Sequence, residues 1–112
     1  MIWDVHCHFP RNFGAEEEED PAKLIDQRAD ALREFLRQVC QHSDYHLLEL
    51  EIEDHWVRLL LSLQPAHSPA KTVQTIKANS SRLILEAFPE IEREIGRRSL
   101  WSRAYYLRGI GD

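Results

Sequence analysis

The sequence has no apolar run long enough to cross a membrane. A membrane-spanning helix needs about 20 predominantly apolar residues, and Arg58 interrupts the longest apolar stretch of this chain. The first four residues, Met1-Ile2-Trp3-Asp4, also lack the basic start and the apolar core of a signal peptide. We therefore expect a cytoplasmic protein with no membrane partner.

Cysteine and positive charge are both scarce. The two cysteines, Cys7 and Cys40, have no motif spacing, so we expect reduced, buried thiols. Lysine and arginine number 14 against 19 aspartate and glutamate residues, and the net charge is −5. That balance argues against indiscriminate binding to nucleic acid. Residues 64–112 carry eight bases against five acids, so a site for a polyanion would lie in this half of the chain.

Hydrophobic periodicity divides the chain into strands and helices. Alternation of apolar and polar residues predicts four strands: residues 2–9, 45–53, 56–63 and 100–107. Apolar residues at helical spacing predict a helix that begins at Asp20-Pro21 and runs to about Gln41. A second helix begins at Ser68-Pro69, with a break near Asn79-Ser80, and a short helical piece spans residues 89–95.

The order of these elements predicts the fold. With 112 residues we expect one domain over residues 1–112. Strand, helix, strand, strand, helix, strand is the split βαβ order of an α+β, ferredoxin-like domain with an antiparallel sheet. Its first and third strands lie side by side in the centre of the sheet, and the helices cover one face and leave the other open. Function must therefore be argued from this open face and the surfaces beside it.

Two pairs of residues should meet on the open face. His6 and His8 flank Cys7 in the first strand, and with Asp4 they could bind a metal; an ordinary polar strand face is the alternative. Trp56 and Arg58 of the third strand would lie beside them. That pair could stack a nucleobase and grip a phosphate, or it could be a partly buried tryptophan with a surface arginine.

Three stretches of the sequence resemble a known protein family. They read LLELEIEDHWVRLLLSLQPAHSP, SSRLILEAFPEI and LWSRAYYLRGIG. In this order and register, over residues 45 to 111, they resemble the small single-tyrosine HUH transposases of insertion sequences and their REP-associated relatives. The resemblance implies DNA transposition as the ancestral activity, a homodimer formed through the sheet, and single-stranded or hairpin DNA as the partner.

The resemblance also implies that the chemistry of the family is missing. Members hold a divalent metal with two histidines of the third strand, and a tyrosine of a C-terminal helix attacks the DNA. By resemblance the histidine positions fall on Trp56 and Arg58, while His55 is expected to be a turn residue that pairs with nearby acids. The sequence ends at Asp112, where the tyrosine helix would begin, and Tyr105 and Tyr106 match strand residues. We therefore expect no strand cleavage and no cofactor.

A basic and polar set matches the part of the family that contacts hairpin DNA. It comprises Lys71, Lys77, Ser80, Ser81 and Arg82, and arginines 97, 98, 103 and 108 (Arg103 and Arg108 on or near the last strand) extend it. A solvated helix face is the alternative. The sequence thus favours a transposase-derived DNA-binding protein. Two other functions stay open: a metal-dependent nuclease that uses His6, His8 and Asp4, and a dimeric interaction module without a role on DNA.

Overall fold

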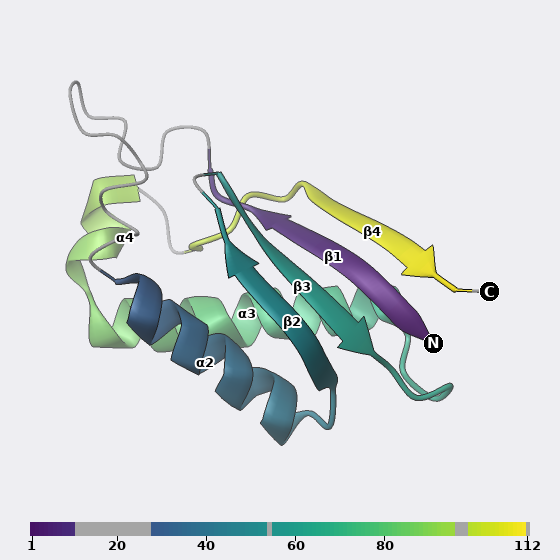
Figure 1. Cartoon of the computed structure of the whole chain (residues 1–112). Coiled ribbons are helices and arrows are strands. Elements are labelled where there is room, and N and C mark those ends of the chain that lie inside the picture. The colour runs from purple at the N-terminus through teal and green to yellow at the C-terminus, as the bar shows by residue number, and fades with distance from the viewer. Residues whose placement is uncertain (11–27, 54, 96–98, 112) are drawn as a thin grey trace.

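The structure is a computed structural model, and it describes residues 1–10, 28–53, 55–95 and 99–111 of the chain. Its elements, in order, are β1 (Ile2–His8), α2 (Ala29–His42), β2 (His46–Ile52), β3 (Trp56–Ser62), α3 (Pro69–Ala87), α4 (Glu90–Ile95) and β4 (Tyr105–Ile110) (Figure 1). The predicted start of the first helix at Asp20-Pro21 lies outside the described residues. The end of that helix at His42 agrees with the prediction.

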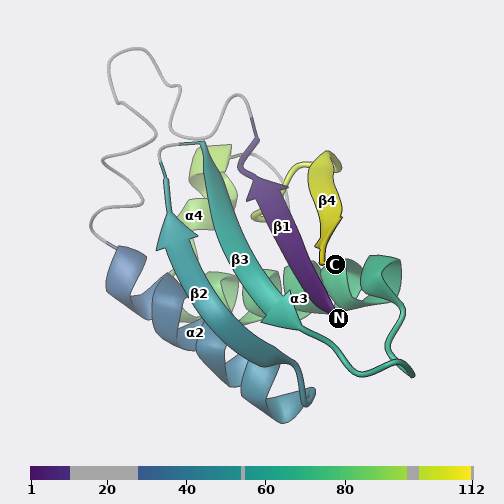
Figure 2. The same cartoon turned by 45° about the vertical axis from the view of Figure 1, so that its right-hand side comes forward.

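The four strands form one sheet in the order β2-β3-β1-β4. Every neighbouring pair is antiparallel, with Val5 of β1 opposite Leu59 of β3 on one side and Leu107 of β4 on the other. The two long helices, α2 and α3, lie against one face of the sheet, and the other face is open (Figures 1 and 2). The ferredoxin-like prediction, with the first and third strands at the centre, is confirmed.

The core lies between the sheet and the helices. Alternation on β3 buries Val57, Leu59 and Leu61 completely, because successive side chains of a strand point to opposite faces. The two helices meet them with apolar side chains: Leu32, Leu36 and Val39 of α2, and Val73, Ile76 and Ile84 of α3. Each fully buried aliphatic side chain contributes about 1.5–3 kcal/mol.

Both cysteines belong to this core. Cys7 and Cys40 are buried and free, as predicted. Burial raises the pKa of each thiol to about 12, because a thiolate would lose its hydration there. These thiols are therefore apolar packing groups rather than nucleophiles.

Helix α3 begins where the sequence predicts but does not break. The Ser68 hydroxyl accepts a hydrogen bond from the backbone N–H of Lys71, 3.3 Å away, and proline follows at the first helical position. The predicted break near Asn79-Ser80 is wrong. The Asn79 amide donates to the carbonyl of Thr75 (2.9 Å), and the Ser80 hydroxyl donates to the carbonyl four residues before it. Such local bonds let polar residues stay inside a helix.

The last strand begins later than predicted. The prediction placed it at residues 100–107, whereas β4 spans Tyr105–Ile110. Leu100 and Trp101 are buried, but they lie in the segment before the strand. The Trp101 ring stacks on Phe9 with centroids 5.0 Å apart. Tertiary packing, rather than a strand, produced the apolar pattern there. No helix in the described part of the chain is long and apolar enough to cross a membrane.

Candidate functional site

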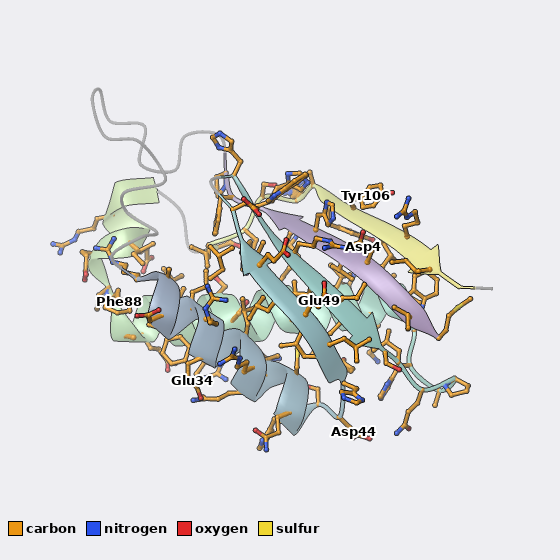
Figure 3. The ribbon with its side chains drawn as sticks, viewed as in Figure 1. Asp4, Glu34, Asp44, Glu49, Phe88 and Tyr106 are labelled. Carbon is orange, nitrogen blue, oxygen red and sulfur yellow. The ribbon has the colours of Figure 1, made fainter. Side chains whose placement is uncertain are left out.

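The open face of the sheet brings together polar and aromatic side chains from all four strands. Strand register aligns Glu51, Arg58, His6 and Tyr106 across β2, β3, β1 and β4, and it aligns Asp4 with Arg108 one step along. Figure 3 shows Asp4, Glu49 and Tyr106 on three of these strands. The predicted neighbourhood of His6 and His8 with Trp56 and Arg58 follows directly from the pairing of β1 with β3.

Asp4 is the centre of this face. Its carboxylate is only 6% exposed, and its Oδ1 accepts a hydrogen bond of 3.0 Å from Nε of Arg58. Nε2 of His6 lies 3.2 Å from the same oxygen, in a direction that does not make a hydrogen bond, and Nη2 of Arg108 lies 4.0 Å from Oδ2. A carboxylate removed from water in this way needs a positive partner, and Arg58 is the nearest one.

Arg58 is held by acids on both sides. Besides Asp4, its Nη1 lies 3.7 Å from Glu49 and 3.9 Å from Glu51 of β2. The hydrogen bond and charge of Asp4, followed by the charges of Glu51 and Glu49, raise the pKa of the guanidinium above its usual value. The positive charge of Arg58 is therefore fixed at the middle of a group of three carboxylates.

Aromatic rings form a row beside this ion pair. The His6 ring lies 4.5 Å from the Trp56 ring in an edge-to-face arrangement and 4.9 Å from the Tyr106 ring. The His8 ring lies 5.6 Å from Trp56. Partial burial, then the charges of His6 and Lys77, lower the pKa of His8. Trp56 and Tyr106 keep 36% and 42% of their surface exposed, so the row is accessible from outside.

The predicted DNA contacts separate into three groups. Ser80 and Ser81 are buried, and their hydroxyls accept hydrogen bonds of 2.9 Å from the indole N–H of Trp101 and the backbone N–H of Leu100. These serines hold the segment before β4 against α3, and their contact with DNA stays a prediction. Arg108 lies on the open face beside Asp4, away from the α3 residues.

A basic groove contains two of the others, Lys77 and Arg82. It lies between α3 and the segment before β4, has a volume of about 530 Å³, and is lined by Gln74, Lys77, Ala78, Ser81, Arg82 and Ser99. Nζ of Lys77 donates to the carbonyl of Arg103 (3.4 Å) and lies 5.4 Å from the Tyr105 ring centroid. Arg82 forms an exposed pair with Glu86 at 3.6 Å. Lys71 is exposed in the first turn of α3, and arginines 97 and 98 lie outside the described residues.

A family comparison agrees with this fold. The family model described as "Transposase IS200 like" matches residues 20–112. The chain belongs to the IS200-like transposase family.

Individual relatives of this family match most of the chain. The ISDra2 transposase TnpA of Deinococcus radiodurans is 25% identical over 89 residues, which are 80% of this chain and 64% of the relative. The transposase of insertion sequence element IS200 of Salmonella typhimurium is 26% identical over 85 residues, 76% of this chain and 56% of the relative. The chain thus spans less than two thirds of the length of these relatives.

Two solved structures share the fold. A candidate transposase from Deinococcus radiodurans R1 superposes with a TM-score of 0.82 at 23% identity and covers 100% of this chain and 80% of its own. A REP-associated tyrosine transposase bound to a REP hairpin gives a TM-score of 0.62 at 12% identity, over 99% of this chain and 56% of its own. At these identities the likeness concerns the fold.

The open face of this member of the IS200-like transposase family does not fit a divalent metal. Trp56 and Arg58 stand where the resemblance places two histidines; an indole is no ligand, and a guanidinium repels a cation. Within residues 1–10, 28–53, 55–95 and 99–111, no three His, Cys, Asp or Glu side chains are placed to hold a metal. Asp4 also faces Arg58 at 3.0 Å. The geometry gives no support to a nuclease built on Asp4, His6 and His8.

Sequence reasoning missed part of the site. It assigned no role to Tyr106, which the pairing of β4 with β1 places opposite His6, nor to Glu49 and Glu51. A correct start for β4 would have provided the signal for Tyr106. His55 is exposed, and its carbonyl accepts a hydrogen bond from the N–H of Phe9 at 2.8 Å. The pairing of its ring with nearby acids stays a prediction, because Asp54 lies outside the described residues.

Proposed function

We propose that this chain is a DNA-binding derivative of an IS200-like transposase that holds single-stranded or hairpin DNA without cutting it. The observation that carries the proposal is the Asp4–Arg58 ion pair on the open face. It stands where members of the family are expected to hold a metal, while a basic groove on the other side of the molecule keeps the means to bind DNA.

The loss of cleavage follows from the charge of Arg58. In metal-assisted phosphodiester chemistry the cation polarises the scissile phosphate and needs ligands that tolerate positive charge. Here a fixed guanidinium occupies that place, and the carboxylates around it neutralise it. A guanidinium engaged with three acids has little charge left for a phosphate, so we expect neither metal binding nor strand cleavage.

DNA binding is supported by the groove between α3 and the segment before β4. Lys77 and Arg82 line it, and Arg103 is tied to Lys77 through its carbonyl. The net charge of −5 repels DNA elsewhere on the chain, so binding should depend on these few cations and fall steeply with salt. For the two cations that line the groove, the slope of log K against log salt is about −1.4 to −1.8.

Titration of a labelled DNA hairpin tests this function. The structural neighbour that was solved with a REP hairpin makes a hairpin the natural probe. Anisotropy should show binding that weakens between roughly 50 and 200 mM salt, and Lys77→Ala with Arg82→Ala should abolish it. Arg93→Ala removes an exposed positive charge from α4, outside the groove, and should change little. Absence of binding at low salt would leave the interaction module as the better function.

We also propose a homodimer formed through the sheet. Strands β2 and β4 are its two edges, and an edge strand offers unpaired backbone groups to a second copy. Leu48 of β2 adds a large exposed apolar side chain at one edge. Sedimentation equilibrium should show a dimer that Leu48→Lys dissociates if β2 is the edge used. A monomer at every concentration tested would contradict the proposed dimer.

A further inference from the structure

The rings of Trp56, His6 and Tyr106 form a continuous strip across β3, β1 and β4. His6 is the middle ring, 4.5 Å from one neighbour and 4.9 Å from the other. The two outer rings are each more than a third exposed. We call this row of three rings the aromatic strip. It lies on the open face of the sheet, whereas the basic groove lies on the helix side.

The aromatic strip is held in place from below. Asp4 is buried under it, with His6 3.2 Å and Arg58 3.0 Å from the same carboxylate oxygen. The His8 ring lies 5.6 Å from the Trp56 ring in an edge-to-face arrangement. Fixed strand register and this ion pair therefore present the rings with little freedom to reorient. A preorganised aromatic surface binds a flat partner without the entropic cost of ordering its own side chains.

Charge around the strip selects the kind of flat partner. On the β2 side, Glu49 and Glu51 repel anions, and the charge of Arg58 is already neutralised. On the β4 side, Arg108 is 63% exposed, and the carboxylate nearest to it is 4.0 Å away. A ligand that stacks on the rings and carries one anionic group toward β4 fits this arrangement.

We propose that the aromatic strip is a stacking site for an unpaired nucleobase of single-stranded DNA, with Arg108 beside its phosphate. This inference rests on the proposed function and deepens it, because it names a second subsite for the same DNA. Stacking on protein aromatic rings suits every base and requires that the base be unpaired. In this proposal the groove holds the hairpin and the aromatic strip holds its unpaired tail.

Two features distinguish this subsite from the groove. Its affinity comes from stacking and from a single cation, so the tail should add a slope of no more than about −1 to the dependence of log K on log salt. Its loss should weaken binding of a tailed hairpin by about 5- to 150-fold, the range for one stacked base. The groove, with two cations, should show a stronger dependence on salt and no dependence on the rings of the strip.

Paired hairpins test the subsite. Anisotropy would compare a blunt hairpin, the same hairpin with an unpaired thymidine tail, and the same tail made abasic. The intact tail should raise affinity, and the abasic tail, which keeps only the phosphate contact, should raise it much less. Trp56→Ala and Tyr106→Ala should each remove that increment and leave the blunt hairpin unaffected. Trp56→Phe keeps a ring and should retain the increment, which also covers the case in which an alanine variant fails to fold.

Intrinsic fluorescence provides a readout independent of the groove. Trp101 is buried and Trp3 is partly buried, whereas Trp56 is exposed. An oligothymidylate should quench emission in the wild type and in Lys77→Ala with Arg82→Ala, and quenching should disappear in Trp56→Phe. If blunt-hairpin binding fails but quenching persists, the proposed function of the groove is wrong and the proposed stacking site is supported.

Three results would contradict the proposal that the aromatic strip is a stacking site. One is an equal loss for blunt and tailed hairpins in Trp56→Ala. Another is an abasic tail that binds as well as the intact tail, because this would assign the tail contact to phosphates. The third is conversion of a dimer into a monomer by Trp56→Ala or Tyr106→Ala, because the rings would then be covered by a second copy of the chain.

Discussion

Two polar clusters in this fold lie on opposite sides of the sheet and differ in their charge and in their exposure to solvent. Under the sheet, the hydroxyls of Ser80 and Ser81 are buried and bonded at 2.9 Å to N–H groups of Trp101 and Leu100. On the open face, Asp4 is surrounded by charged and aromatic side chains that remain partly in solvent. A neutral, sealed cluster stabilises a fold, whereas a charged, open cluster is available to a ligand.

Replacement of Trp101 should have the largest effect on stability. Its ring is buried, stacks on Phe9 at 5.0 Å and donates to Ser80. Trp101→Ala should lower the free energy of unfolding by about 3–5 kcal/mol, the usual loss for a buried aromatic side chain. Urea denaturation measures it, with the exposed Trp56→Ala as the matched tryptophan control. Equal losses for the two variants would contradict the contrast between the clusters.

Ser81→Ala should come next. The change removes the acceptor of the buried N–H of Leu100, and an unsatisfied buried donor costs about 1–3 kcal/mol. The same denaturation curves measure it, and the partly exposed Ser102, whose hydroxyl has a marginal 3.5 Å contact, serves as control. Retained stability combined with weaker hairpin binding would mean that Ser81 contacts DNA after all.

The ion pair of the open face should show measurable coupling between its partners. A double-mutant cycle with Asp4→Asn and Arg58→Met isolates their interaction. The exposed helical pair Arg82–Glu86, at 3.6 Å, is the reference, and such pairs are worth about 0.3–0.5 kcal/mol. We expect the Asp4–Arg58 coupling to exceed this reference because the carboxylate is buried. A coupling energy no larger than that of Arg82–Glu86 would show that the Asp4–Arg58 pair behaves as an ordinary solvated ion pair.

The smallest effect should be a pH dependence from His8. Its pKa is lowered from 6.5 by partial burial and by neighbouring positive charges. The unfolded chain then binds the proton more readily than the folded one, so stability falls as pH drops through 6.5. His8→Gln should flatten the pH profile of the unfolding midpoint between pH 7 and 5, relative to His46→Gln on β2. A profile that His8→Gln leaves unchanged would contradict this assignment.

The fold was predictable because its signals are local and periodic. Alternation in β3 and the Ser68-Pro69 cap each require only nearby residues, and both predictions are confirmed. The false break at Asn79-Ser80 and the early start of β4 have different causes. Local bonds of Asn79 and Ser80 to carbonyls four residues before them keep the helix continuous. The apolar pattern before β4 reflects the packing of Trp101, whose indole N–H donates to Ser80 across 21 positions of sequence. Strand alternation does not detect a contact at that distance.

The open-face site was half predictable for a related reason. Strand alternation placed His6 and His8 beside Trp56 and Arg58, and the register of β1 with β3 bears this out. The sequence could not show which charged side chains of the open face form ion pairs with each other. Asp4 was a candidate metal ligand in the sequence, whereas in the structure it is the partner of Arg58. Asp4 neutralises a guanidinium instead of binding a metal because Arg58 lies next to it.

The most direct test of the account is a calorimetric titration of the wild-type chain with Mn²⁺. If Arg58 occupies the cation position beside Asp4, no binding heat should appear up to millimolar metal, and a hairpin should remain uncut in the same buffer. Stoichiometric Mn²⁺ binding that Asp4→Asn or His6→Ala abolishes would contradict the claim that Arg58 takes the place of a metal. The open face would then be a working metal site rather than an ion pair beside a stacking surface.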